Sequence, residues 1–112
     1  MTDINTVVVV GRLTKNAEFR QVGGTTKASF SLAVSRSRKV NDQWEDETSY
    51  VDIQVWGKMA QNLEGRLPKG TKVTVEGYLR QESWEQNGEK RHKLVVVANM
   101  VDAPRGQNDG SW

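Results

Sequence analysis

The chain has 112 residues, with sixteen lysines and arginines against fourteen aspartates and glutamates and a net charge of +2. This length suits one ordinary domain and leaves no room for a second. With no cysteine, the composition excludes disulfides, a thiol nucleophile and a thiolate metal site, and His92 alone cannot build a metal site. We therefore expect no metal and no other cofactor.

The N-terminus, "MTDINTVVVVGR", lacks the basic start and long apolar core of a signal peptide. No stretch approaches the length of about 18 apolar residues that a membrane span needs. The absence of cysteine also fits a reducing compartment. We expect a soluble protein of the cytoplasm.

The acidic residues are unevenly distributed. Five of the fourteen lie between positions 42 and 52, a segment that we interpret as an acidic loop, and the rest of the chain has sixteen basic residues against nine acidic ones. A basic surface is typical of a protein that binds a polyanion, although solvated lysines alone would give the same excess.

The first predicted elements are β-strands. Residues 4–13, "INTVVVVGRL", form a β-branched apolar run in which Gly11 allows a bend or bulge. "VGGT" at 22–25 predicts a turn, and residues 27–35 alternate between apolar and polar side chains. The next strand, "TSYVDIQVWGK" at 48–58, also alternates. Its apolar face has Val51, Ile53 and Val55, and its polar face has Tyr50, Asp52, Gln54 and Trp56.

A short helix and two more strands follow. Met59, Leu63 and Leu67 recur every fourth residue, which predicts one helix within residues 57–70. Residues 71–84 predict a strand whose inward residues are Val73, Val75 and Leu79. The Asn87-Gly88 pair predicts a tight hairpin into a last strand at 91–101. We expect one domain over residues 1–103 and a short flexible tail over 104–112.

This order of elements predicts an all-β OB-fold, a five-stranded Greek-key barrel with one short helix between its third and fourth strands. Four segments, "NTVVVVGRLTKNAEFR", "SYVDIQVWGKMAQNL", "LPKGTKVTVEGYLR" and "ESWEQNGEKR", resemble the bacterial single-stranded DNA-binding proteins in order and spacing, over about residues 4–103. The resemblance implies a nucleoid-associated protein that coats and protects exposed single strands in replication, recombination and repair. It would bind without sequence specificity and without catalysis.

The aromatic residues on open strand faces are the candidate base-stacking groups. Every nucleobase has a π-face, so Tyr50 and Trp56 can stack on any base. The resemblance implies this role for both and for Trp84, which alternation places outward with Lys72, Tyr78 and Arg80. The alternative is that these rings pack against another subunit, the helix or a hairpin. Trp44 has acidic neighbours that repel phosphate, so packing that pins the loop explains it better.

Several basic residues near these strands are candidate contacts to the DNA backbone: Arg36, Arg38, Lys39, Lys58, Lys69, Lys72 and Arg80. Each alone is more readily explained as a solvated side chain, but together with the three rings they form a mixed basic and aromatic lining. The sequence departs from the family at Arg38, where relatives often have another stacking aromatic. It also has Glu82 and Ser83 where basic residues are common, so we expect weaker binding or a different path of the strand.

The first strand has apolar residues on both faces, namely Val7, Val8, Val9 and Val10. A barrel interior covers only one face, so the other face implies a partner surface. In relatives this strand pairs subunits, and the resemblance implies a homotetramer, or at least a dimer. The last strand, with Leu94 and Val96 on one face and Val95 and Val97 on the other, is also expected to be covered on both sides.

Three questions remain open from the sequence. Relatives have an acidic tip at the end of their C-terminal tail, and this tip recruits replication and repair proteins. This chain ends "NDGSW", and Asp109 and Trp112 do not by themselves support such recruitment. A primosome-type OB module, which docks proteins and binds DNA only secondarily, is the alternative function, and a preference for RNA is also possible. For an enzyme, Asp46 and Glu47 are explained better as a solvated pair than as an acid/base site.

Overall fold

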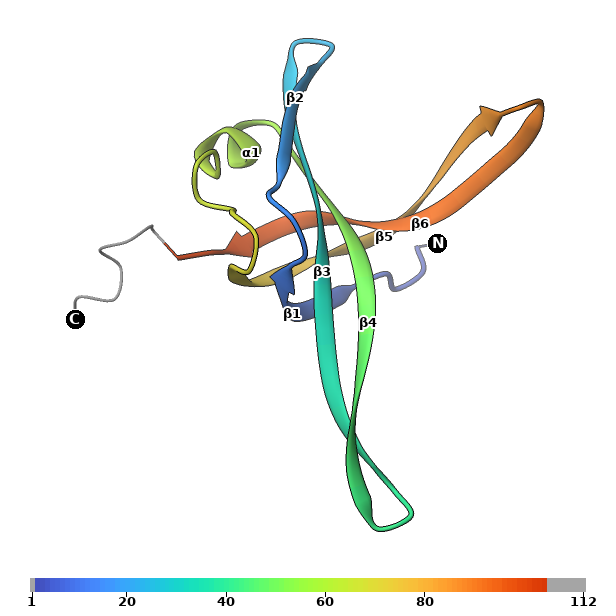
Figure 1. Ribbon diagram of the computed structural model, residues 1–112. Coiled ribbons are helices and arrows are strands. Elements are labelled where there is room, and N and C mark those ends of the chain that lie inside the picture. The colour runs from blue at the N-terminus through green and yellow to red at the C-terminus, as the bar shows by residue number, and fades with distance from the viewer. Residues whose placement is uncertain (1, 105–112) are drawn as a thin grey trace.

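The computed structural model describes residues 2–104 as six strands and one short helix (Figure 1). The helix α1 (Lys58–Asn62) lies between the fourth and fifth strands. The strands are β1 (Val7–Leu13), β2 (Glu18–Val22), β3 (Thr25–Val40), β4 (Gln43–Trp56), β5 (Lys72–Gln86) and β6 (Glu89–Asp102). Most of the predicted tail, with Asp109 and Trp112, falls outside the described residues.

Five of the strands close into a barrel. They follow the order β1, β5, β6, β4 and β3, and β3 pairs back with β1. Every pair is antiparallel except β4–β6, which is parallel. This is the predicted five-stranded OB-fold barrel with its helix in the predicted place. The additional strand, β2, forms a hairpin with β3 and was not predicted from the sequence.

Alternate residues of β3 and β5 fill this barrel, and β6 buries four consecutive residues, 95–98. The largest fully buried aliphatic side chains of the core are Leu32, Ile53, Val55, Val73, Val75, Val95 and Val96. Burying each such side chain stabilises the fold by about 1.5 to 3 kcal/mol. Leu79 is exposed, contrary to the prediction that it faces inward. In the last strand Val95, Val96 and Val97 are buried, as expected for a strand covered on both sides, whereas Leu94 is exposed. Leu79 lies beyond Gly77, where the pairing of β5 with β1 ends, and Leu94 lies beyond the β4–β6 pairing at Ile53↔Val96.

Two glycines allow the barrel strands to approach closely. β1 pairs with β5 from Val7 to Arg12 and begins to pair with β3 at Arg12. A Cβ at Gly11 would lie 2.6 Å from the backbone oxygen of Ala33, so a side chain here would separate β1 from β3. At the register shift between β5 and β6, a Cβ at Gly77 would lie 2.0 Å from the oxygen of Val97. The expected bend at Gly11 is thus a point of close strand contact.

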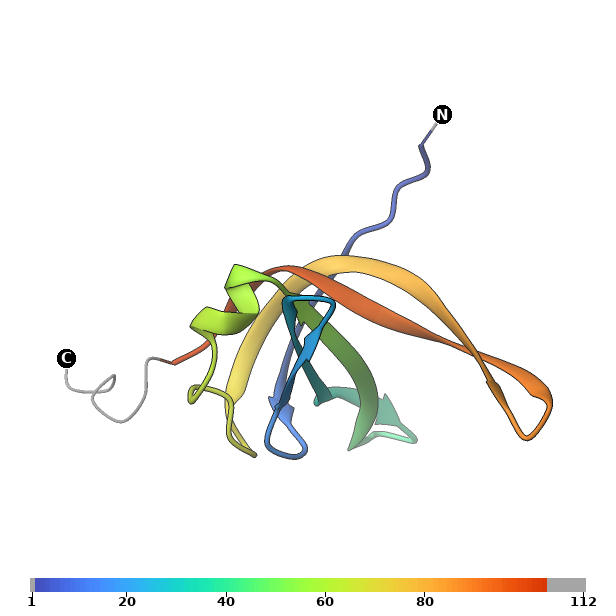
Figure 2. The same ribbon diagram turned by 90° about the horizontal axis from the view of Figure 1, so that it is seen from above.

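Two hairpins extend beyond the barrel as two-stranded arms, β3–β4 and β5–β6 (Figure 1). Their turns, Asn41-Asp42 and Asn87-Gly88, have positive φ at both residues, as two-residue turns of type I′ require. The Asn87-Gly88 turn confirms the predicted hairpin. The Asn41-Asp42 turn corrects the interpretation of residues 42–52 as an acidic loop, because most of that segment belongs to strand β4. Figure 2 shows the β5–β6 arm pointing away from α1.

The helix is shorter than predicted. It ends at Asn62 rather than continuing toward residue 70, and Gly65 adopts a φ of 80° in the turns that follow. Leu63 and Leu67 are buried as expected, but Leu67 reaches the core from a turn. Within residues 2–104, no helix has the length and apolar character needed to cross a membrane.

Candidate functional site

The outward face of β4 is the centre of the candidate site. β3 and β4 pair without a register shift from Lys27↔Trp56 to Val40↔Gln43, so alternation holds over the whole strand. Ile53 and Val55 are buried in the core, as the sequence predicted. Tyr50 is 72% exposed on the opposite face, where Trp56 is half-buried.

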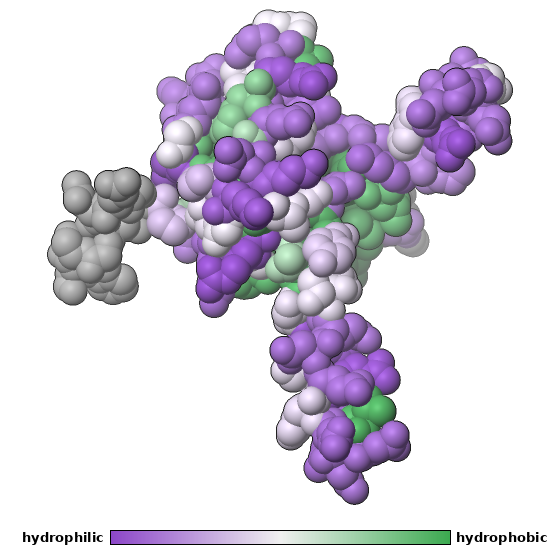
Figure 3. All heavy atoms as spheres, in the orientation of Figure 1, coloured by the Kyte–Doolittle hydropathy of each residue, from purple (hydrophilic) through white to green (hydrophobic). Residues whose placement is uncertain are grey.

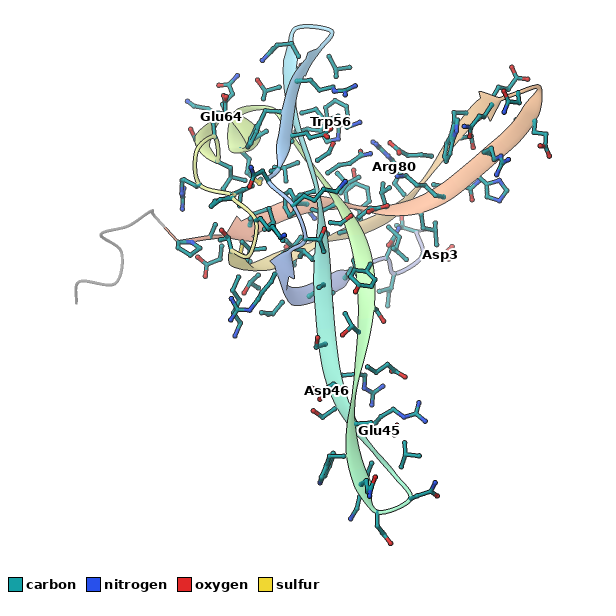
Figure 4. All side chains as sticks on the ribbon, in the orientation of Figure 1. Asp3, Glu45, Asp46, Trp56, Glu64 and Arg80 are labelled. Carbon is teal, nitrogen blue, oxygen red and sulfur yellow. The ribbon has the colours of Figure 1, made fainter. Side chains whose placement is uncertain are left out.

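Trp56 lies between strands that supply two cations. Lys27 is its direct partner on β3, and its Nζ lies 5.3 Å from the centroid of the Trp56 ring. The Cζ of Arg80, on β5, lies 5.9 Å from the same centroid. Figure 4 shows Trp56 and Arg80 at the barrel, away from Glu45 and Asp46 on the β3–β4 arm. A base stacked on this ring would therefore have positive charge beside its phosphates.

Gln54 joins these groups into one hydrogen-bonded network. It was predicted to face solvent, but its side chain is only 5% exposed. Its Oε1 accepts hydrogen bonds from Trp56 Nε1 at 3.3 Å and from Arg80 at 2.6 Å, and its Nε2 donates to Glu82. The amide therefore holds the indole and the guanidinium in fixed positions.

Two carboxylates on this face are held by hydrogen bonds. The hydroxyl of Ser31 donates to Asp52 and lowers the pKa of that carboxyl, and Lys93, 3.3 Å away, lowers it further against the effect of partial burial. The hydrogen bond from Gln54 lowers the pKa of Glu82, with smaller contributions from Lys27, Lys93 and Arg80. Both groups are therefore ionised at neutral pH. They orient the cations and also reduce the positive charge available to a phosphate.

A groove of about 250 Å³ connects these residues across the barrel. One wall is the loop after β1, with Thr14, Lys15 and Asn16, and the other comes from β5 and β6, with Glu82 and Lys93. The floor comes from β3 and β4 and includes Lys27, Asp52 and Gln54. The groove thus lies along the polar face that the sequence assigned to β4.

Trp84 lies on the β5–β6 arm, 41% exposed, and Arg91 of β6 is its direct partner. It shares the outward face of β5 with Arg80 and Glu82, as alternation predicted. This second aromatic and cation pair extends the face of Trp56 along the second arm.

The predicted backbone contacts fall into three groups. Arg80 belongs to the network around Trp56, and Lys39 lies on the same face of β3–β4 as Tyr50. Lys58, Lys69 and Lys72 are exposed. Arg36 and Arg38 lie instead on the opposite face of the β3–β4 arm, where Arg38 forms a 3.1 Å ion pair with Glu47.

Comparison with known proteins identifies the family. The model of the "Single-strand binding protein family" matches residues 4–104. The chain belongs to this family. A single-stranded DNA-binding protein of Treponema pallidum is 43% identical over 102 residues, which cover 90% of this chain and 58% of that protein. One of Borreliella burgdorferi is 38% identical, with 96% of this chain and 75% of the relative covered.

Solved structures of the single-strand binding proteins show the same fold. A mutant of the protein from Thermus aquaticus superposes with a TM-score of 0.81 at 27% identity, over 95% of this chain and 53% of that one. The SSB of Plasmodium falciparum, in a complex with ssDNA, has a TM-score of 0.80 at 20% identity and covers 92% and 95% of the two chains. The chain spans little more than half of the Treponema and Thermus proteins.

Membership of the single-strand binding protein family bears on the functions that the sequence left open. The relatives described above are named as single-stranded DNA-binding proteins, and this does not favour the primosome-type alternative. The enzyme alternative loses its candidate residues as well. Asp46 accepts a 2.9 Å hydrogen bond from Ser37, and Glu47 pairs with Arg38, both on exposed strand. Among residues 2–104, no cluster of His, Cys, Asp or Glu side chains could hold a metal ion.

Several residues of this candidate face were missed in the sequence. Gln54 was noted only as polar, and Lys27, Arg91 and Lys93 were not selected. Counting outward from a two-residue turn gives the cross-strand partners. The Asn87-Gly88 turn would therefore have placed Arg91 opposite Trp84 and Lys93 opposite Glu82.

The exposure of Trp44 does not support the prediction that its ring packs within the chain and pins the loop. Trp44 is 71% exposed near the end of the β3–β4 arm, where Lys39 is its direct partner. An indole this exposed does not pin a loop within one chain.

Proposed function

We propose that the chain binds single-stranded DNA along the face of Tyr50, Trp56 and Trp84, and that it coats and protects exposed strands in replication, recombination and repair. The observation that supports this most directly is the Trp56 ring with Lys27 at 5.3 Å and Arg80 at 5.9 Å, on an open face of a single-strand binding protein. No catalytic step is required. The protein would act in the cytoplasm, at the nucleoid.

Stacking and charge provide the binding energy in this proposal. Each base stacked on an aromatic ring contributes about 1 to 3 kcal/mol, as measured by alanine substitution. Arg80, Lys39, Lys58, Lys69 and Lys72 then contact phosphates, together with Lys27, Arg91 and Lys93, which the structure adds to the face. Arg36 and Arg38 contribute less in this arrangement, since they lie on the other face of the arm.

Gln54 explains why the binding should be independent of sequence. A side-chain amide is the group that reads an adenine edge in double-stranded DNA. Here both ends of the amide are already bonded within the protein, to Trp56, Arg80 and Glu82. The amide at the centre of the face is therefore occupied, and the remaining contacts, rings and cations, do not distinguish bases.

The assembly we propose is a homotetramer, with a dimer as the minimum. Val7 and Val9 pack against the core, whereas Val8 is 62% exposed and Val10 is also exposed. Val8 on β1 is opposite Glu76 on β5, and Glu76 is in turn opposite Met100 on β6. Met100 is exposed as well, so it lies on the same outer face as Val8. This outer face is the surface that a second subunit would cover.

A titration of intrinsic fluorescence tests the proposal. Oligo-dT and mixed-sequence DNA should bind with affinities within about an order of magnitude, and duplex DNA should bind far more weakly because its bases are already stacked. A matched RNA oligomer shows whether the 2′-OH matters. Equal affinity for duplex and single-stranded DNA, or no binding to either, would favour the primosome-type alternative. A strong preference for one defined sequence would contradict the stacking mechanism.

A further inference from the structure

Each of the three tryptophans within residues 2–104 has a cation as its direct cross-strand partner. Lys27 faces Trp56, Arg91 faces Trp84 and Lys39 faces Trp44. Directly opposed side chains in an antiparallel pair have Cβ atoms about 5 Å apart. Every one of these indoles therefore has a basic side chain opposite it, and at Trp56 the charged group lies 5.3 Å from the ring centroid. Trp44 repeats the local arrangement of the two tryptophans to which we assign base stacking.

Trp44 also lies on the same side of its hairpin as the other rings of β4. The pairing of β3 with β4 has no register shift between residue 43 and residue 56, so Trp44, Tyr50 and Trp56 share one face by alternation. Six residues separate Trp44 from Tyr50, a distance of about 20 Å along an extended strand. Because a two-stranded ribbon twists, this face turns about the arm between the two rings.

Two of the four acidic residues between positions 42 and 47 are directed away from Trp44, and Asp42 lies in the turn. Glu45 and Glu47 alternate to the other face, where their direct partners are Arg38 and Arg36. Asp46 remains on the face of Trp44, and it accepts the hydrogen bond from Ser37. The acidic neighbours of Trp44 therefore repel a phosphate less than they would if all of them surrounded the ring in a loop. Lys39 also opposes the negative charge that remains on this face.

The environment of the ring leaves it free to bind. Trp44 is 71% exposed and is not part of the hydrophobic core cluster. The space-filling view shows the outer part of the β3–β4 arm as largely hydrophilic on the visible face (Figure 3). A broad apolar surface, which a stable protein interface would need, is not seen on that side of the arm.

We propose that Trp44 and Lys39 form a further subsite for single-stranded nucleic acid near the end of the β3–β4 arm. This inference rests on the proposed function and extends the path of the strand beyond Tyr50. At 3.4 Å per nucleotide in a stacked strand, the distance of about 20 Å requires no more than about six nucleotides. An extended strand would reach Trp44 with fewer.

Binding to oligo-dT of two lengths tests the subsite. An oligomer of about three nucleotides is too short to contact Trp44 together with the Trp56 ring and its two cations, whereas one of about thirty covers all three rings. Trp44→Ala should weaken binding of the long oligomer by roughly 5- to 150-fold, the usual range for loss of a stacking ring, and leave the affinity for the short one unchanged within about two-fold. Trp44→Phe should restore most of the loss and Trp44→Leu little, because leucine has no π-face.

The cation is tested by salt dependence on the long oligomer. Lys39→Gln should reduce the slope of log affinity against log salt by about 0.7, the effect of one phosphate contact on a single strand. Lys90→Gln is the matched control, since Lys90 lies near the end of the other arm but faces Glu85 on the side away from Trp84. That variant should leave the slope unchanged.

The possible failures are distinguishable. If Trp44→Ala binds the long oligomer as the wild type does, the subsite is wrong and the proposed function stands. If Trp44→Ala changes the molecular mass by light scattering and spares DNA binding, the ring belongs to a protein contact and the subsite is also wrong. If the wild-type chain binds neither oligomer, the proposed function itself fails, and the subsite with it.

Discussion

The guanidinium of Arg80 donates a 2.6 Å hydrogen bond to the side-chain oxygen of Gln54, although the two residues lie on strands that do not pair with each other. The same oxygen accepts a hydrogen bond from Trp56, and the amide nitrogen donates to Glu82. One nearly buried amide thus connects a stacking ring, a cation and a carboxylate. These hydrogen bonds organise the face before any ligand binds, which in the proposed function reduces the entropy that DNA binding must overcome.

Gln54→Leu should therefore impair both stability and binding. The substitution leaves Trp56 Nε1, Arg80 and Glu82 without their shared partner, and we expect the free energy of unfolding to fall by about 1 to 3 kcal/mol. Affinity for oligo-dT should also fall, since the ring and the guanidinium lose their fixed positions. Urea unfolding and fluorescence titration measure the two effects. Gln61→Leu, at an exposed position of α1, is the control; a Gln54→Leu variant that behaves like it would refute the positioning role.

Trp56 and Lys58 should separate stacking from charge. Trp56→Ala should cost about 1 to 3 kcal/mol of binding free energy at every salt concentration and leave the salt slope nearly unchanged. Trp56→Phe should recover much of this loss and Trp56→Leu should not. Lys58→Ala should instead flatten the slope by about 0.7. One titration series over salt concentration distinguishes the two forces, and equal rescue by leucine and phenylalanine would mean that the ring packs rather than stacks.

Val8 and Val9 are adjacent but point to opposite faces of β1, so the same substitution should have different effects. Val9→Lys places a charge against the core and should lower the free energy of unfolding by on the order of 3 kcal/mol or more. Val8→Lys leaves the barrel folded and should dissociate the oligomer, because Val8 lies on the exposed outer face. Light scattering and thermal unfolding report the two outcomes. A wild-type monomer at micromolar concentration would rule out the assembly.

Asp52 and Glu82 should make stability depend on pH in the acid range. Their pKa values are lower in the folded chain than in the unfolded one, chiefly because Ser31 and Gln54 donate hydrogen bonds to them. Their contribution is therefore fully present above the ordinary carboxyl pKa of about 4 and is lost as the pH falls through the lower folded values. Asp52 is half exposed, so its share should be below about 1 kcal/mol.

Asp52→Asn tests this pH dependence. The variant should be slightly less stable than the wild type at pH 7, and the difference should shrink as the pH falls below about 4, where the wild-type carboxylate is protonated. Asp3→Asn, at an exposed carboxylate outside the groove (Figure 4), is the control. A difference between wild type and Asp52→Asn that persists at pH 2 would show that the charge of Asp52 is not the cause.

Local sequence determined much of the binding face. The two-residue period of residues 48–58 placed Tyr50 and Trp56 outward and Ile53 and Val55 inward, because successive side chains of a strand alternate without any help from the rest of the fold. The Asn87-Gly88 turn likewise fixed the register of the β5–β6 arm, since a type I′ turn pairs the residues on either side of it. The order of strands and helix was enough to predict the barrel.

Other features of the arms were encoded locally but missed. Asn41 and Asp42 tolerate the positive φ that a type I′ turn needs, yet the acidic residues after them suggested a loop. With that turn recognised, Lys39 would have been placed opposite Trp44 and Lys27 opposite Trp56. Only then does Trp44 become comparable with Trp56 and Trp84.

Tertiary structure alone decided the chemistry at the centre of the face. Gln54 and Arg80 belong to strands that do not pair with each other, and no periodicity within either strand indicates that one amide will meet a guanidinium, an indole and a carboxylate. It also decided that Leu79 is exposed, because β5 continues past the wall that buries Val73 and Val75. Alternation determines which way a side chain points, whereas closure of the barrel determines what it meets there, and that depends on contacts between residues far apart in the sequence.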